Sequence, residues 1–132
     1  MTNPVISGND VFSHVFLGAA DLGKSAAFYD AALGALGIKN LGPFGATCTL
    51  YGRDKPAFII GKPGNGQAPT SNGVTVGFAA ANPAEVDAFH AAGLAHGGTC
   101  EGAPGTRTHL PGAYAAYVRD PSGNKVCAYT FV

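Results

Sequence analysis

The sequence predicts an α+β fold in which two tandem βαβββ modules form curved mixed sheets around a concave pocket. The first observation is a repeat, because a shift of 61 positions aligns two segments that each read as a strand, a capped turn and a helix. The aligned pairs are His14 with Thr75, Leu17 with Phe78, Asp21 with Asn82, Ser25 with Val86, Phe28 with Phe89, Tyr29 with His90, Leu33 with Leu94 and Gly37 with Gly98. The second observation is that several strand-like stretches follow each helix. One helix cannot cover so many strands alone, so the two curved sheets are expected to face one another or a partner subunit across the pocket. A four-stranded ferredoxin-like layer fits less well, because too many strands follow each helix.

Module one is predicted for residues 10–61. Residues 11–17 are rich in bulky and β-branched side chains and are expected to form a strand. Asp21 is placed to cap the helix that follows, whose apolar positions recur at steps of three and four. Two further strands are predicted at 47–51 and 57–61, joined by a hairpin turn.

A linker at residues 62–72, rich in proline, glycine and polar residues, is predicted to join the modules. Module two is predicted for residues 73–132, so that residues 1–132 make a single domain. Its predicted elements are a strand at 74–79, a helix at 85–96 capped by Asn82 and Pro83, a strand that begins near Thr99, a long loop at 104–112, and strands at 114–119 and 125–131.

Composition excludes several classes of partner. The 132 residues carry 8 basic and 8 acidic side chains without a cluster of either sign, so we expect neither nucleic acid nor a membrane as partner. No apolar run approaches the roughly 20 residues that cross a bilayer. The three cysteines are widely spaced and no signal sequence accompanies them, so we expect free thiols and a cytoplasmic location.

Motifs near both ends of the chain resemble a known family. The first group is His14-Val15-Phe16-Leu17, Asp21-Leu22, Ser25, Phe28-Tyr29 and Leu33-Gly34, and the second is Tyr114 with Ala116 to Lys125. This combination resembles the vicinal oxygen chelate superfamily, which includes glyoxalase I, bleomycin-resistance proteins and extradiol dioxygenases. The similarity covers nearly the whole chain. It implies a glyoxalase-like fold, whereas one fold commonly hosts unrelated functions.

The resemblance implies metal ligands on the first and last strands of each module, where His, Glu and Gln are usual. The matching positions here are His14, Ala57 or a neighbour, Thr75 and Cys127, and only His14 fits the family pattern. Hard divalent ions and iron need carboxylates or more histidines than this set offers. A softer divalent metal held by His14 and Cys127, with Thr75 or His109 completing the shell, is the one cofactor that we consider.

Candidate site residues follow from these strands and loops. His14 and Cys127 are the candidate catalytic residues, as general base and thiol, although a cysteine on a strand is often inert packing. Candidate substrate-binding residues are Tyr114, Tyr117, Tyr129, Arg107, His109 and Thr75. Because Tyr114 and Tyr117 are an odd number of positions apart on one strand, they are expected on opposite faces, so that one lines the pocket.

Three hypotheses for function remain open at this point. In the first, the chain binds a small organic molecule in the pocket between the modules and has a degraded metal site. In the second, it is a metal-dependent lyase or dioxygenase that acts on a substrate with vicinal oxygens. In the third, it is a degenerate family member whose main property is dimerisation. The resemblance also leads us to expect a homodimer.

Overall fold

The structure, a computed structural model, describes residues 6–132. Its elements in chain order are β1 (Val15–Gly18), α1 (Leu22–Gly34), β2 (Lys39–Phe44), β3 (Cys48–Gly52), β4 (Phe58–Gly61), β5 (Thr75–Ala79), α2 (Pro83–Ala95), β6 (Thr99–Thr106), β7 (Ala113–Arg119) and β8 (Lys125–Phe131). They form two four-stranded sheets, with strand orders β1-β4-β3-β2 and β5-β8-β7-β6. In each sheet the first strand pairs in parallel with the last, and the other neighbours are antiparallel. The predicted α+β fold with two βαβββ modules is therefore confirmed.

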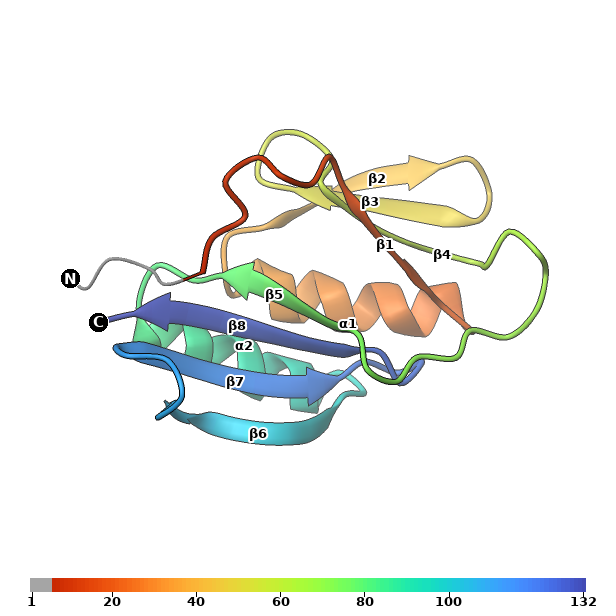
Figure 1. Ribbon diagram of the computed structural model, residues 1–132. Coiled ribbons are helices and arrows are strands. Elements are labelled where there is room, and N and C mark those ends of the chain that lie inside the picture. The colour runs from red at the N-terminus through yellow and green to blue at the C-terminus, as the bar shows by residue number, and fades with distance from the viewer. Residues whose placement is uncertain (1–5) are drawn as a thin grey trace.

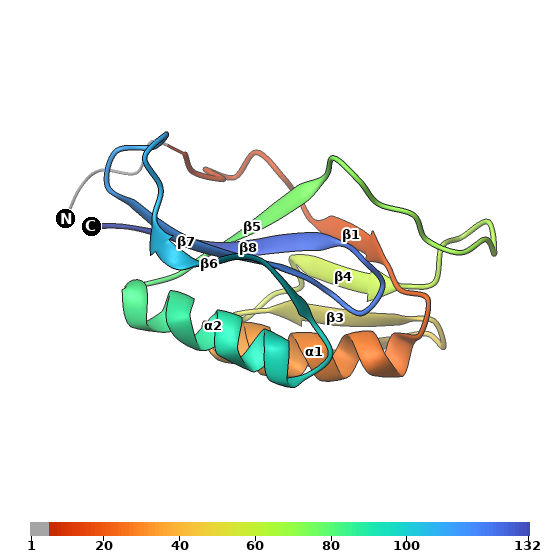
Figure 2. The same ribbon diagram turned by 90° about the horizontal axis from the view of Figure 1, so that it is seen from below.

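The two sheets form one layer and the two helices form the other (Figures 1 and 2). The sheets lie side by side in this layer, and α1 and α2 pack against each other beneath it. Within the chain the sheets therefore do not face each other, and of the two expected arrangements the one in which they face a partner subunit stays a prediction. The helices supply the reason, because both cover the same side of the strand layer and leave its other side open.

Both helices begin at the predicted capping residues. The Asp21 side chain accepts a hydrogen bond from the amide of Lys24 at 3.0 Å, and the Asn82 side chain accepts one from the amide of Glu85 at 2.9 Å. Each cap satisfies an amide that has no partner within the first turn. Helix α2 starts at Pro83, two residues before the predicted start, because proline's fixed φ suits the first helical position.

Strand β1 is shorter than predicted and begins at Val15 instead of Val11. Asn9 and Asp10 have positive φ angles of 47° and 59°, which turn the chain just before the predicted strand. Val11 and Phe12 are each 72% exposed, so their apolar side chains do not mark a strand that packs on the core. A hydrophobic stretch was therefore mistaken for the start of the strand.

Strand β2 was not predicted, and β6 occupies the first part of the predicted loop at 104–112. Gly42, in the middle of β2, has a φ of 104°, and the pairing with β3 shifts between Asn40 and Gly42. The Asn40 side chain accepts a hydrogen bond from the Gly42 amide at 2.8 Å, which supports this bulge. Glycine and proline inside a strand weaken the alternation by which strands are recognised.

A single apolar core lies between the strand layer and the helices and includes side chains from both modules. The Phe58 and Phe78 rings, on β4 and β5, meet edge to face with their centroids 5.0 Å apart. The Phe28 ring of α1 lies against Gly93 of α2, where an added Cβ would be 3.1 Å from the ring. Because aromatic contacts cross between the modules, each helps to bury the other.

The turn between β7 and β8 connects the two modules through the carboxylate of Asp120, which is only 5% exposed. The Tyr29 hydroxyl of α1 donates to Asp120 Oδ2 at 2.6 Å. The amides of Ser122 and Asn124 donate to Oδ1, and the Asn124 side-chain amide donates to Oδ2. That same side-chain amide also donates to the Gly18 carbonyl at the end of β1, at 2.8 Å. A buried carboxylate is stable only with such donors.

The corresponding turn of module one, between β3 and β4, reaches in the opposite direction. Arg53 donates to the Leu36 carbonyl at 2.7 Å and to the Ala79 carbonyl at the end of β5 at 3.3 Å. The turn is tight at Gly52, where an added Cβ would lie 1.8 Å from the Lys55 carbonyl oxygen. Each module therefore places its hairpin turn on the first strand of the other.

Neither helix of residues 6–132 has the length and hydropathy that a membrane-spanning helix needs.

Replacing Tyr29 by phenylalanine is expected to destabilise the protein. The change leaves Asp120 buried with one donor fewer, and an unsatisfied buried group costs about 1–3 kcal/mol. The matched control is Tyr114→Phe, which deletes a hydroxyl that donates to the exposed Asp87 at 2.6 Å. Urea unfolding should give a clear loss for the first variant and a much smaller one for the second; equal losses would contradict the role of Asp120.

Stability is expected to fall above pH 10. Burial and the nearby carboxylates, Asp120 for Tyr29 and Asp30 for Tyr51, raise the pKa of each phenol above its usual value. The unfolded chain loses these protons near pH 10, so each group lowers the free energy of unfolding by about 1.4 kcal/mol per pH unit above that pH. Urea unfolding at pH 8 and pH 11 should show this decline, which Tyr29→Phe should make less steep. Equal stability at both pH values would refute the burial of these phenols.

Gly52→Ala is expected to destabilise the turn between β3 and β4. The new methyl group would overlap the Lys55 carbonyl, and the forced backbone shift should cost about 1–3 kcal/mol. Gly34→Ala is the control, because it lies at the exposed end of α1 with no atom within 4 Å of the added Cβ. That variant should be neutral or slightly stabilising by helix propensity. Thermal unfolding of both compares them directly.

Candidate functional site

Side chains on alternate positions of the second sheet point away from the helices. Val126 and Ala128 of β8 belong to the core. Because successive side chains on a strand point to opposite faces, Lys125, Cys127 and Tyr129 lie on the other side. Tyr117 of β7 shares this side, since it pairs with Cys127 in the strand register. We call this surface, formed by Tyr117, Lys125, Cys127 and Tyr129, the open face of the second sheet.

Two tyrosines and two cations meet on the open face. The Tyr117 and Tyr129 rings pack edge to face with centroids 5.9 Å apart. The Arg107 guanidinium carbon lies 5.3 Å from the Tyr117 ring centroid, and the Lys125 ammonium lies 5.1 Å from it. Arg107 also donates to the Ala103 and Gly105 carbonyls, which hold its side chain against the sheet. The cluster is therefore an ordered aromatic surface with positive charge beside it.

The two phenol hydroxyls form one hydrogen bond and leave one proton free. Their oxygens are 2.5 Å apart, and either can be the donor. The accepting hydroxyl keeps its own O–H, which is available to a further acceptor. Burial, followed by the bond to Tyr129, raises the pKa of Tyr117. The raised pKa keeps the Tyr117 hydroxyl protonated at physiological pH, so the pair of phenols can donate one hydrogen bond to a ligand.

Cys127 lies beneath this cluster and is 2% exposed. Burial raises the pKa of its thiol to about 12, although Lys125 and Arg107 act in the opposite direction. The thiol is therefore protonated at neutral pH, whereas the thiolate is the form that acts as nucleophile or metal ligand. Its catalytic role stays a prediction that this environment disfavours.

The four positions implied as metal ligands fall into two pairs, one on each sheet. His14 is exposed at the start of β1, where its Nδ1 and the Ser13 hydroxyl are 2.9 Å apart. In the strand register Phe16 pairs with Ile59, as Gly77 pairs with Cys127. Ile59 is therefore the counterpart of Cys127 in the strand register of the first module, two positions from Ala57, the residue named from the sequence with its neighbours. Neither Ala57 nor Ile59 has a side-chain atom that can bind a metal.

These residues do not fit a divalent metal. The set offers one imidazole, one hydroxyl and one protonated thiol, whereas metal sites need at least three deprotonated or neutral donors. Among residues 6–132, no group of three or more His, Cys, Asp and Glu side chains is arranged to hold a metal ion. The chemistry of the open face is therefore that of its phenols and cations.

The remaining candidate site residues do not all lie on the open face. Thr75 is exposed and pairs with Lys125, so it borders the open face. Tyr114 packs toward the helices and donates to Asp87 of α2, which confirms that it and Tyr117 occupy opposite faces. His109 is exposed in the loop between β6 and β7. Lys125 was missed, although its even spacing from Cys127 and Tyr129 indicated the same face.

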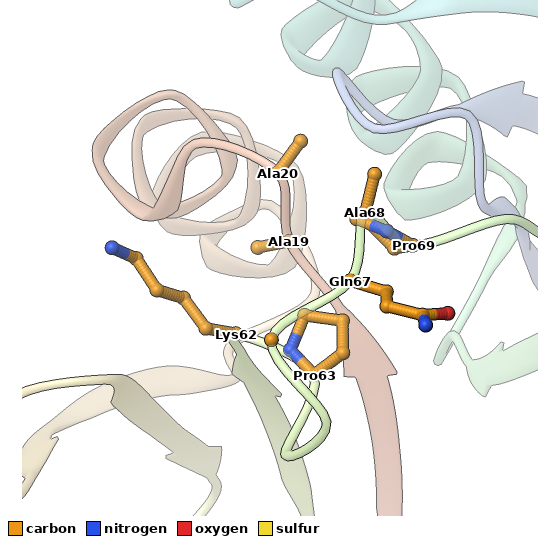
Figure 3. A pocket seen from close by; sticks show the side chains of 8 residues that line it. Ala19, Ala20, Lys62, Pro63, Gln67, Ala68 and Pro69 are labelled. Atoms are coloured by element: carbon orange, nitrogen blue, oxygen red, sulfur yellow. The ribbon is translucent and has the colours of Figure 1, made fainter.

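Two adjoining cavities lie between the linker and the end of β1. The first, of about 260 Å³, has Ala19 and Ala20 on one side and linker residues from Lys62 to Pro69 on the other (Figure 3). The second, of about 310 Å³, includes Phe16 and Gly18. An added Cβ on Gly18 would lie 2.7 Å from Pro69 Cβ, so the linker sits directly on this strand. The linker is recognisable in the sequence, whereas these cavities are not; the run of small residues at 18–20 is the one feature that points to them.

Comparison with known proteins places this architecture in a family. A family model described as the glyoxalase/bleomycin resistance protein/dioxygenase superfamily matches residues 11–128. A crystal structure of a glyoxalase/bleomycin resistance protein from Albidiferax ferrireducens T118 is 52% identical, with a TM-score of 0.78, and the match covers 89% of this chain and 96% of that one.

More distant structures share the fold. Lactoylglutathione lyase from Agrobacterium tumefaciens is 20% identical with a TM-score of 0.62, and the match covers 90% of this chain and 92% of that one. A glyoxalase-related enzyme from Fulvimarina pelagi is 21% identical with a TM-score of 0.70, over 89% and 85% of the two chains. No protein with a curated description matches the sequence significantly. On the match to residues 11–128 and the shared fold, this chain belongs to the glyoxalase/bleomycin resistance protein/dioxygenase superfamily.

Proposed function

We propose that this chain binds a small, planar organic anion on the open face of the second sheet and does so without a metal. The observation that carries the proposal is the cluster of Tyr117, Tyr129, Arg107 and Lys125. Half-buried aromatic rings offer stacking area, and the free phenol O–H offers one donor to a ligand oxygen. The sequence led us to expect binding in a pocket between the modules; the proposal keeps the binding function and moves its site to the second sheet.

The charge of the cluster favours an anion. Among the described residues, the one salt bridge joins Arg119 to Glu101. The charge of Glu101 also interacts with that of Lys125, but no carboxylate forms an ion pair with Arg107 or Lys125. Both cations are half-buried beside the Tyr117 ring. A carboxylate or phenolate oxygen of a ligand would supply the missing negative charge, and charge-assisted hydrogen bonds are the stronger kind.

The donor set supports binding over metal chemistry. A lyase or dioxygenase that acts on vicinal oxygens would need a metal to polarise them. Such a metal would have to be held by His14, Thr75 and Cys127, which offer only one imidazole, one hydroxyl and one protonated thiol. The name of the 52% identical structure is compatible with either reading. The homodimer expected from the resemblance stays a prediction, and a second copy would enlarge the site if it covered the open face.

Binding is tested with two probes of matched shape, 1-naphthoate and the neutral 1-naphthalenemethanol, by isothermal titration calorimetry. The carboxylate should bind more tightly, because it pairs with Lys125 and accepts the free phenol proton. Lys125→Met keeps much of the side-chain volume and removes the charge. It should weaken naphthoate binding by about tenfold, or about 1.4 kcal/mol, and leave the alcohol unchanged.

Two controls complete this experiment. Tyr114→Phe, on the opposite face, should leave both affinities unchanged. Incubation with EDTA should also have no effect on naphthoate binding. Equal affinities for the two probes, or no effect of Lys125→Met, would refute the assigned site. Loss of binding with EDTA that Zn²⁺ or Mn²⁺ restores would favour the metal-dependent alternative.

A further inference from the structure

A cysteine and a histidine lie side by side on the face of the strand layer that the helices cover. Cys100 of β6 is exposed, and its Sγ lies 3.2 Å from Nε2 of His90 on α2. In the register of the sheet Cys100 pairs with Val118, whose side chain belongs to the core between the strand layer and the helices. The pair of Cys100 and His90 is therefore on the face opposite the tyrosine cluster.

The surroundings keep His90 available as a base. Burial lowers the pKa of the imidazole, and the carboxylate of Asp87 opposes this shift less strongly. Asp87 lies one helical turn before His90 and accepts the hydroxyl proton of Tyr114 on β7 at 2.6 Å. Helix α1 and strand β8 present apolar side chains to α2, such as Phe28 and Val126. The charge of Asp87 and the thiol of Cys100 thus act on His90, and Tyr114 acts on Asp87.

The three cysteines of the chain occupy three different environments, which provides an internal comparison. Cys127 is buried and has a raised pKa. Cys48 is half-buried, and its Sγ lies 3.8 Å from the Thr47 hydroxyl oxygen. Cys100 alone combines an exposed position with a ring nitrogen at hydrogen-bond distance. A nucleophile and a base within such reach are the arrangement that activates thiols in proteins.

We propose that Cys100 is a nucleophilic thiol, activated by His90, that adds to α,β-unsaturated carbonyl compounds. His90 Nε2 takes the thiol proton, and the sulfur forms a bond to the β-carbon of the acceptor. The electron pair of the C=C bond moves toward the carbonyl. The proton then returns from the imidazolium to the α-carbon, so no oxidant or leaving group is needed. The site accepts soft carbon electrophiles and is separate from the proposed anion site.

The test uses N-ethylmaleimide, which belongs to this class, at a stoichiometry below one per chain. Peptide mass spectrometry at pH 7 should find Cys100 modified at least about tenfold faster than Cys48, since His90 can take the Cys100 proton whereas the neighbour of Cys48 is a hydroxyl. Cys127 should react only after unfolding. This comparison needs no variant, so it does not depend on any substitution being tolerated. Equal rates for Cys100 and Cys48 would overturn the proposal.

The role of His90 is tested with His90→Gln and a matched control, His96→Gln. His96 is the C-cap residue of the same helix, and its Nδ1 lies 2.9 Å from the Ala92 carbonyl oxygen. The first variant should slow the reaction of Cys100 about tenfold at pH 7, and the control should not. A second readout is the pH dependence of the wild-type rate between pH 6 and 8, which His90→Gln should change and His96→Gln should not. An unchanged rate and pH profile in His90→Gln would refute activation by His90.

Discussion

The buried carboxylate of Asp120 is the constraint on which the fold most depends. Its donors come from the Tyr29 hydroxyl of module one and from the turn of module two, and Asn124 ties the same turn to the end of β1. Removing these groups from water is costly unless all of them are paired at once. The turn at 120–124, which composition alone marks as an ordinary connection, therefore fixes the relative position of the two modules.

Much of the fold was predictable because its signals are local. The capping residues Asp21 and Asn82, the apolar stripe of α1 and the alternation in β8 each reflect interactions within a few residues. β2 was missed because Gly42 and its bulge interrupt the pattern. The arrangement of the sheets depends on contacts such as Phe58 with Phe78, which are far apart in sequence and leave no local pattern.

The features of the site also divide into those that local sequence patterns predict and those that depend on the three-dimensional arrangement. The tyrosines at 117 and 129 and their shared face follow from strand alternation, and so does the opposite placement of Tyr114. The hydroxyl contact between Tyr117 and Tyr129, and the position of Arg107 over one ring, depend on side-chain conformations in three dimensions. The pairing of His90 with Cys100 joins a helix to a strand edge across a turn. Ten positions separate these two residues, and nothing in that spacing predicts a contact.

The reciprocal turns have a consequence for how the protein loses its structure. Ser122 and Asn124 hold β1, while Arg53 reaches the end of β5. Neither half can open without exposing the other's carboxylate, carbonyls and aromatic rings. The duplicated halves are consequently expected to melt as one cooperative unit, and a truncated chain of either half alone would present an apolar surface prone to aggregation.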